Sequence, residues 1–206
     1  MKVLEPPEVV EHADGPALLW RFDEPVQAAS SAVLGGGIGP RSWIVNAQVS
    51  LDYRHDDPAA HVAAIGAGLG LTPSAGVGLL TAASVRDVIW AKEDSACCAA
   101  TVGLSTPTWA AAPDRTWSRW SPGTVNIVCW VPAALSDAAL VNAVITSTEA
   151  KSQALLEREV PGTGTASDAI VVCCPDGGTE PYGGPRSTWG ARLARAVHRA
   201  VLAGVE

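Results

Sequence analysis

Residues 161–172, PGTGTASDAIVV, join a polar, glycine-rich turn to an apolar run of β-branched residues. A phosphate-binding loop has the opposite order, because its glycines follow a strand and open a helix. Here the glycines precede the run Ile170-Val171-Val172, and no Gly-Lys-Ser/Thr ending follows. The stretch therefore indicates a tight turn that feeds a strand, with Asp168 accepting hydrogen bonds from turn amides.

The segments around this turn alternate between helical and extended patterns. A long helix is predicted over 137–157 and a last helix over about 187–203, while Asp57 and Pro58 open a shorter helix earlier in the chain. Strands are predicted at 8–12, 17–22, 26–34, 42–53, 76–83, 85–93, 97–104, 124–131 and 169–175. Strands followed by alternating helices and strands predict one α+β domain over residues 1–206, with a mixed, largely antiparallel sheet and at least three helices.

Polar side chains interrupt the predicted apolar face of the helix over 137–157. At about 100° per residue, that face is formed by Val141, Val144, Ile145 and Leu155. Thr148 falls in its middle, and Glu149 and Lys151 lie on opposite shoulders, about 160° apart. A buried polar group without a partner costs ~1–3 kcal/mol. The pattern therefore indicates either a buried hydrogen-bond network or a ligand site.

Composition excludes several classes of function. The chain has 206 residues and a net charge of −7, which argues against a surface for nucleic acid or anionic membranes. No apolar run approaches the roughly 20 residues of a membrane span, and the first residues show no apolar signal segment. We expect a soluble, cytoplasmic protein, while its oligomeric state stays open.

The cysteines and histidines do not form a recognisable metal motif. The five cysteines lie in apolar runs without C-x-x-C spacing, which predicts buried structural thiols rather than a catalytic cysteine. His55, Asp56, Asp57 and His61 cluster around a helix start, but capping by Asp57 and packing of His61 explain them better than a metal does. No metal site is predicted, and metal dependence stays open.

Several stretches of this chain occur together, and in the same order, in one known family. They are SSAVLGGG (30–37), VNAQVSLDYRHDDPAAH (45–61), GVGLLTAA (76–83), ATVGLS (100–105), PGTVN (122–126), TSTEAKSQAL (146–155), GTGTASDAIVV (162–172) and YGGPRSTWG (182–190). On these stretches the chain resembles the adenosylcobinamide amidohydrolases of corrinoid salvage. One departure is Arg186-Ser187, where the family's pattern has a His-Thr pair, and its consequence stays open.

The resemblance implies hydrolysis of the amide that joins a propionyl side chain of the corrin ring to aminopropanol, which yields adenosylcobyric acid. Adenosylcobinamide would then be the substrate, and no cofactor is implied. Two alternatives remain: a corrinoid-binding protein without catalysis, and an amidase or self-processing hydrolase with a Gly-Thr nucleophile that acts on another substrate.

Amide hydrolysis needs an activated nucleophile, donors for the oxyanion and an acid for the leaving amine. Hydroxyls beside glycines are candidate nucleophiles: Ser30, Ser31, Thr124, Thr163 and Thr165. Asn126 is a candidate donor, and Glu149, Asp168 and His55 are candidate bases. The expected catalytic set is Asp168, Glu149, Asn126, Lys151 and Thr165. The expected substrate-binding set is Ser31, Gly36, Gly37, Tyr53, His55, Thr101, Thr124, Thr148, Thr163, Trp117 and Trp120.

Two further expectations concern where these residues meet. The segments 35–37, 122–126 and 162–168 are expected to converge on one cleft with the middle of the helix over 137–157. Trp109, Trp117 and Trp120 belong to an aperiodic loop over 105–123, which is longer than most structureless connections. Its tryptophans either cover a corrin ring or fold onto the core.

Overall fold

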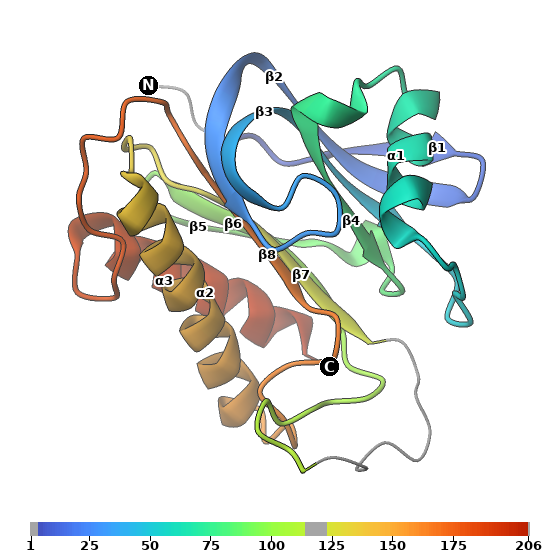
Figure 1. Ribbon diagram of the computed structural model, residues 1–206. Helices are drawn as coiled ribbons and strands as arrows, with labels where there is room; N and C mark the ends of the chain where they lie inside the picture. The colour runs from blue at the N-terminus through green and yellow to red at the C-terminus, as the bar shows by residue number, and fades with distance from the viewer. Residues whose placement is uncertain (1–3, 114–122, 206) are drawn as a thin grey trace.

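The computed structural model describes residues 4–113 and 123–205. They form a mixed, 8-stranded sheet of order β4-β3-β2-β8-β7-β6-β5, with β1 paired to β2 (Figure 1). The strands are β1 Glu8–His12, β2 Gly15–Ser30, β3 Gly37–Gln48, β4 Gly76–Thr81, β5 Ile89–Glu93, β6 Ala96–Gly103, β7 Thr124–Trp130 and β8 Ala169–Cys174. The helices are α1 Pro58–Gly68, α2 Asp137–Glu157 and α3 Thr188–Gly204, and two 3-10 turns span Pro73–Ala75 and Val85–Asp87.

The predicted fold class is confirmed. In the described part of the chain, only the β3–β4 and β7–β8 pairs are parallel, and the other strand pairs are antiparallel. Three α-helices cover the sheet, as expected for an α+β protein. None of the helices in residues 4–113 and 123–205 is both long and apolar enough to cross a membrane.

The long strand β2 makes the sheet curl over itself. Its first half pairs with β1 and its second half with β8, while β3 pairs with both halves along the other edge. A shift of register between Arg21 and Val26 interrupts the pairing with β3. Such bulges increase the local twist of a strand. β2 runs on through residues 23–25, whereas the sequence predicted two separate strands on either side of them. With the added twist, the two halves of the sheet face each other.

Three apolar clusters fill the layers that result. One lies between the two halves of the sheet and includes Ile44 and Leu79 from one half and Val128 and Val171 from the other. A second joins β6, β7 and β8 to α2 and α3, and a third joins β2 and β3 to α1. Figure 1 shows the consequence, with α2 and α3 on one side of the strands and α1 on the opposite side.

The helices begin where their caps predict. Asp57 caps α1, since its side chain accepts a hydrogen bond from the Ala60 amide at 2.9 Å. Ser136 caps α2 and Ser187 caps α3 in the same way. Because Ser187 fills the cap of α3, the Arg186-Ser187 departure falls at a helix start, and Arg186 is exposed there.

The predicted buried face of α2 is wrong. Val141 and Ile145 are each 49% exposed, and Thr148 is exposed with its hydroxyl donating to the Val144 carbonyl at 2.9 Å. The buried face instead carries mostly small side chains: Ala139, Leu140, Ala143, Thr146, Ser147, Ala150, Lys151, Ala154 and Leu155. Small residues let α2 approach α3 and the sheet closely, so packing distance overrides the position of the larger apolar side chains.

This exposure pattern predicts that substitutions on the two faces of α2 differ in their effect on stability. Ala143→Leu inserts three carbons into a packed interface and is expected to destabilise the protein by about 1–3 kcal/mol. Ile145→Gln replaces a half-exposed side chain and is expected to change stability by less than ~0.5 kcal/mol. Urea unfolding of both variants measures the difference. The reverse order would restore the face predicted from the sequence.

Candidate active site

A cavity of about 610 Å³ opens where β4 ends and where β7 and β8 begin. The curl of the sheet brings these points together, because β4 lies over β7 across the inner face. The cavity is also lined by the segment that follows β2 and by the chain between β3 and α1. Its polar lining side chains include Ser31, Tyr53, His55, Thr81, Thr124, Asn126, Ser167 and Asp168.

Asp168 and Lys151 form a buried ion pair behind this cavity. Their side chains are only 10% and 7% exposed, and the ammonium of Lys151 donates to Oδ2 of Asp168. The carboxylate also accepts hydrogen bonds from the Val125 amide at 2.9 Å, the Thr165 amide at 3.1 Å and the Thr165 hydroxyl at 2.5 Å. The Thr165 hydroxyl carries one proton and also lies 2.6 Å from the Gly123 carbonyl, so Oδ2 accepts two bonds, while Oδ1 accepts one from Val125 and competes with that carbonyl for the Thr165 proton. Asp168 therefore fixes the start of β7, the turn and the middle of α2 to one another.

The glycines of the 161–172 stretch are explained by close contacts. A Cβ on Gly164 would lie 2.2 Å from Oδ2 of Asp168 and 2.5 Å from Nζ of Lys151. A Cβ on Gly162 would lie 2.5 Å from the Thr108 amide nitrogen. Both distances are shorter than real Cβ contacts allow. The turn therefore uses glycine to admit the ion pair and the neighbouring backbone.

A buried network of amides forms the floor of the cavity. Asn126 is 2% exposed, and its Nδ2 donates to the Leu80 carbonyl and to Oδ1 of Asn46, both at 2.9 Å. Nδ2 of Asn46 donates in turn to the Thr101 hydroxyl at 3.1 Å. In the described part of the chain, Oδ1 of Asn126 has no hydrogen-bond partner. Both N–H bonds of Asn126 are used, so the expected donor role is corrected: the atom left for a ligand is an acceptor.

Hydroxyl groups line the wall beside this network. The Thr124 and Ser167 hydroxyls lie 2.9 Å apart, and the Ser167 hydroxyl also lies 3.1 Å from the Gly123 carbonyl. Since Ser167 can donate to that carbonyl, Thr124 can donate to Ser167. The hydroxyl oxygen of Ser31 accepts from the Ile170 amide at 3.0 Å. These groups give the cavity polar side chains that are already oriented by the protein.

The structure brings together part of the expected site. Ser31, Tyr53, His55, Thr124, Asn126 and Asp168 line the cavity, and Lys151 and Thr165 contact Asp168 from behind. Thr101 reaches the cavity only through Asn46 and Asn126. The expected convergence thus holds for the segments that contain Asn126 and Asp168 and for the middle of α2.

Other expected residues lie elsewhere. Glu149 lines a separate groove between α2 and α3, and Thr148 is on the exposed side of α2. Thr163 lies against Thr108, where its hydroxyl accepts from the Ala110 amide at 3.1 Å. Gly36 and Gly37 lie at the exposed β2–β3 connection and do not line the cavity. Trp117 and Trp120 are outside the described residues, so the structure places neither.

Sequence reasoning missed Asn46 and Thr81 as parts of the site. Asn46 lies inside the apolar strand stretch WIVNAQ, as Asn126 lies inside TVNIVCW. A carboxamide within a buried strand needs partners, so two such residues could have predicted a shared network. Among the described residues, no group of three or more His, Cys, Asp or Glu side chains is placed to hold a metal ion.

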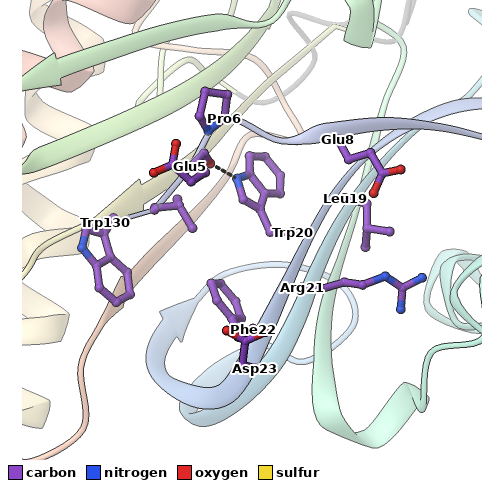
Figure 2. A pocket seen from close by; sticks show the side chains of 10 residues that line it. Glu5, Pro6, Glu8, Leu19, Trp20, Arg21, Phe22, Asp23 and Trp130 are labelled. Atoms are coloured by element: carbon purple, nitrogen blue, oxygen red, sulfur yellow. Dashed lines mark hydrogen bonds between the residues drawn. The ribbon is translucent and has the colours of Figure 1, made fainter. Parts of the chain in front are cut away.

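A second cavity, of about 370 Å³, lies at the other end of the space between the sheet halves. Figure 2 shows Trp20, Phe22 and Trp130 around it, with the Trp20 indole donating to the Glu5 carbonyl at 3.2 Å. Its lining comes from residues 4–8 and 19–23 and from Trp130. None of the stretches that carry the family resemblance contributes to it. The first cavity, at which five of those stretches meet, is therefore the candidate active site.

The cysteines are buried free thiols, as predicted. Burial raises the pKa of Cys97 to about 12 and that of Cys174 to about 11. Burial also raises the pKa of Cys98 and of Cys173 well above the ordinary value. A thiol with a raised pKa stays protonated at neutral pH, and the thiolate is the nucleophilic form. These four thiols are therefore not activated as nucleophiles at neutral pH.

Comparison with known proteins identifies similar sequences. Residues 2–206 match the CbiZ family model, described as adenosylcobinamide amidohydrolase. A protein of Methanosarcina mazei named adenosylcobinamide amidohydrolase is 31% identical over 188 residues, which cover 86% of this chain and 90% of that protein. A Halobacterium salinarum protein of the same name is 42% identical over 116 residues, covering 52% of this chain and 49% of that protein. An uncharacterized protein of Methanocaldococcus jannaschii is 40% identical over 88 residues, covering 39% of this chain and 34% of its own length.

Removal of one charge from the buried pair should cost stability. Asp168→Asn leaves the Lys151 ammonium buried without a counter-charge, which is expected to destabilise the protein by about 3 kcal/mol or more. For a domain of this size, that lowers the melting temperature by ~6–12 °C. The double variant Lys151→Met/Asp168→Asn removes both charges and should recover at least half of the loss. A single variant as stable as wild type would show that the pair does not hold the turn.

The raised thiol pKa values predict slow labelling of the folded protein. At pH 8, a water-soluble disulfide reagent should react with less than one thiol per chain in the native state, because the buried thiols are neutral and covered. In guanidinium chloride all 5 cysteines should react. A thiol that is labelled rapidly in the native protein would contradict this expectation.

Proposed function

Because this chain belongs to the adenosylcobinamide amidohydrolase family, we propose that it hydrolyses the amide between the corrin propionyl group and aminopropanol in adenosylcobinamide. Water supplies the oxygen: a C–O bond forms at the carbonyl carbon and the C–N bond breaks. The nitrogen leaves with one proton from that water. The products are adenosylcobyric acid, as its carboxylate, and free aminopropanol.

One observation carries this proposal. Every residue that lines the larger cavity falls within the stretches that carry the family resemblance: 30–37, 45–61, 76–83, 122–126 and 162–172. These stretches are far apart in the chain, and the fold brings them together at one place. The smaller cavity draws on none of them. Five of the eight stretches therefore meet at this cavity, while parts of the stretches 146–155 and 182–190 line the groove between α2 and α3.

The cavity suits the arm of the substrate rather than the whole corrinoid. A volume of about 610 Å³ lies within the ~300–1,000 Å³ typical of small-molecule sites. A corrin ring is broad and has apolar faces, so the amide and the aminopropanol arm enter while the ring stays at the mouth. Val33, an exposed apolar residue that lines the cavity, offers one such contact at the mouth.

The unpaired oxygen of Asn126 fits an amide substrate. A buried acceptor without a partner costs free energy in the empty protein, and a ligand N–H group removes that cost. The scissile amide carries one N–H group, which we place against Oδ1 of Asn126. When the Ser167 hydroxyl donates to Thr124, the Thr124 hydroxyl proton is left for the neighbouring carbonyl. Binding through Asn126 also fixes which face of the amide is open to attack.

Asp168 acts as a positioning residue in this proposal. Its carboxylate accepts from Lys151 and from the Val125 and Thr165 amides, so at most one lone pair, the one that faces the Thr165 hydroxyl, is left to take a proton from water. Its bond to the Val125 amide holds the strand between Thr124 and Asn126 in place. The alternative of a Gly-Thr nucleophile narrows to Gly123-Thr124, because Thr124 lines the cavity whereas neither Thr163 nor Thr165 does.

The partner in this proposal is the small-molecule corrinoid. A net charge of −7 favours it over nucleic acid. We place the reaction in the cytoplasm, because five buried free thiols suit a reducing compartment.

Turnover of adenosylcobinamide tests the proposal directly. Purified protein incubated with it should yield adenosylcobyric acid and aminopropanol, followed by mass spectrometry, with one ¹⁸O incorporated from labelled water. Asn126→Ala should lower kcat/KM by about 10- to 100-fold, since one buried hydrogen bond to the substrate is lost. Phe22→Leu, in the smaller cavity, is the matched control and should leave turnover unchanged. Tight binding of adenosylcobinamide without product would instead identify a corrinoid-binding protein.

A further inference from the structure

Three side chains form a hydrogen-bonded line that ends at Tyr53, one of the residues that line the larger cavity. Asp14 lies in the β1–β2 turn, His61 on the first turns of α1, and Tyr53 between β3 and α1. Oδ2 of Asp14 is 3.2 Å from Nε2 of His61, and Nδ1 of His61 is 2.9 Å from the Tyr53 hydroxyl. Tyr53 lines the cavity. Figure 1 shows α1 beside the β1–β2 turn, an arrangement that the bond from His61 to Asp14 requires.

The chemistry of Asp14 sets the direction of the hydrogen bonds. An ionised carboxylate only accepts, so Nε2 of a neutral His61 must carry the ring proton. Nδ1 then has a free lone pair and accepts the hydroxyl proton of Tyr53. The lone pairs of the phenol oxygen are left free for a group in the cavity. Catalytic triads have the same order of carboxylate, imidazole and hydroxyl, and in them the imidazole takes the proton of the hydroxyl group.

Ring stacking holds this line in place. The rings of Tyr53 and His61 are 5.5 Å apart between centroids and nearly parallel, at 16°. His55 stacks on His61 at 4.8 Å and 10°. Nδ1 of His55 accepts from the Asp57 amide at 3.1 Å, so His55 is itself fixed to the start of α1. Neither Tyr53 nor His61 can turn freely, and a rigid donor is what proton transfer to a bound substrate needs.

Other ionisable groups surround the line. His12 accepts from the Asp14 amide at 3.3 Å, and the charges of Asp14, His61 and Glu11 act on it. Burial, more than these charges, lowers the pKa of His12, which favours its neutral form. Burial and then the charge of Asp57 raise the pKa of Tyr53. The phenol therefore stays protonated at neutral pH. It can accept a proton only while it gives up its own proton, and it does not act as a preformed phenolate base.

We propose that Tyr53, backed by His61 and Asp14, is the proton relay of the amide hydrolysis proposed above. As water attacks the carbonyl carbon, its proton passes to the Tyr53 oxygen while the Tyr53 proton passes to Nδ1 of His61. Asp14 stabilises the imidazolium that forms. The two transfers then reverse, and Tyr53 protonates the leaving nitrogen as the C–N bond breaks. The relay ends in its starting state, and the product carboxyl group ionises to solvent.

The other bases expected from the sequence fit this role less well. Asp168 has at most one lone pair that is not taken by Lys151 and backbone amides, and Glu149 lies in a different groove. Nδ1 of His55 accepts from the Asp57 amide, so Nε2 of a neutral His55 carries the ring proton and has no lone pair with which to act as a base. In this scheme Tyr53 is the catalytic residue, since it touches the reacting atoms. His61 and Asp14 are positioning residues that act through it. A general acid–base group of this kind typically contributes ~10²–10⁴-fold to the rate.

Conservative substitutions along the line test the relay. Tyr53→Phe keeps the stacked ring and removes only the hydroxyl, and kcat should fall at least about 100-fold with little change in KM. Asp14→Asn should lower kcat about 10-fold or more. It should also shift the acid limb of the kcat/KM profile to lower pH, because a neighbouring carboxylate favours the charged imidazole. A merely structural Asp14 would lower stability without moving that limb. His198→Gln, at a surface contact with Glu157 on α2, is the matched histidine control and should not change the profile.

Two results separate the relay from the function on which it rests. If wild type hydrolyses adenosylcobinamide and folded Tyr53→Phe stays within about twofold of it, the relay alone is overturned. If wild type shows no hydrolysis, the proposed function fails and the relay fails with it.

A measurement without substrate tests the geometry. In ¹⁵N spectra of the histidine rings, His61 should be the neutral tautomer with its proton on Nε2, and the Nδ1 shift should change in Tyr53→Phe. A proton on Nδ1 of neutral His61 would overturn the relay whatever the activity.

Discussion

The carboxylate of Asp168 is the point on which the candidate active site depends. It holds the middle of α2 through Lys151, the start of β7 through Val125 and its own turn through Thr165. These elements come from different layers of the fold, so one side chain sets their relative positions. A buried ion pair of this kind gives little net stability compared with apolar packing. Its contribution here is positional: its bond to the Val125 amide holds the strand that carries Thr124 and Asn126 at the cavity.

Much of the fold follows from local sequence signals. The element order and the mixed sheet were predicted from the capped helix start at Asp57, the turn before Ala169 and the alternation of strands and helices. The curl of the sheet did not follow, because it depends on a register shift within β2 and on strand partners distant in sequence. The buried face of α2 was also wrong, since the closeness of α3 favours small side chains over the larger apolar ones.

The candidate site was predictable where polar residues interrupt strands or follow glycines. Asn126 and Asp168 stood out on those grounds, and both line the cavity. The line from Asp14 to Tyr53 was hidden, because His61 reads as an ordinary helix residue and Asp14 as an ordinary turn residue. The two residues come into contact only because α1 packs against the β1–β2 turn. Glu149 was predicted as a base, but it lies in the groove between α2 and α3. The side of α2 that faces the cavity carries Lys151 instead.

The path of β2 through both halves of the sheet has a consequence for how the protein folds during synthesis. Its second half pairs with β8, and Ser31 bonds to Ile170, 139 residues further along the chain. On the ribosome, that edge of β2 stays unpaired until nearly the whole chain has emerged. Contacts of such long range slow folding, and an open strand edge is a site for pairing with other chains. The same topology that assembles the cavity therefore makes the nascent chain vulnerable to aggregation until its last third is made.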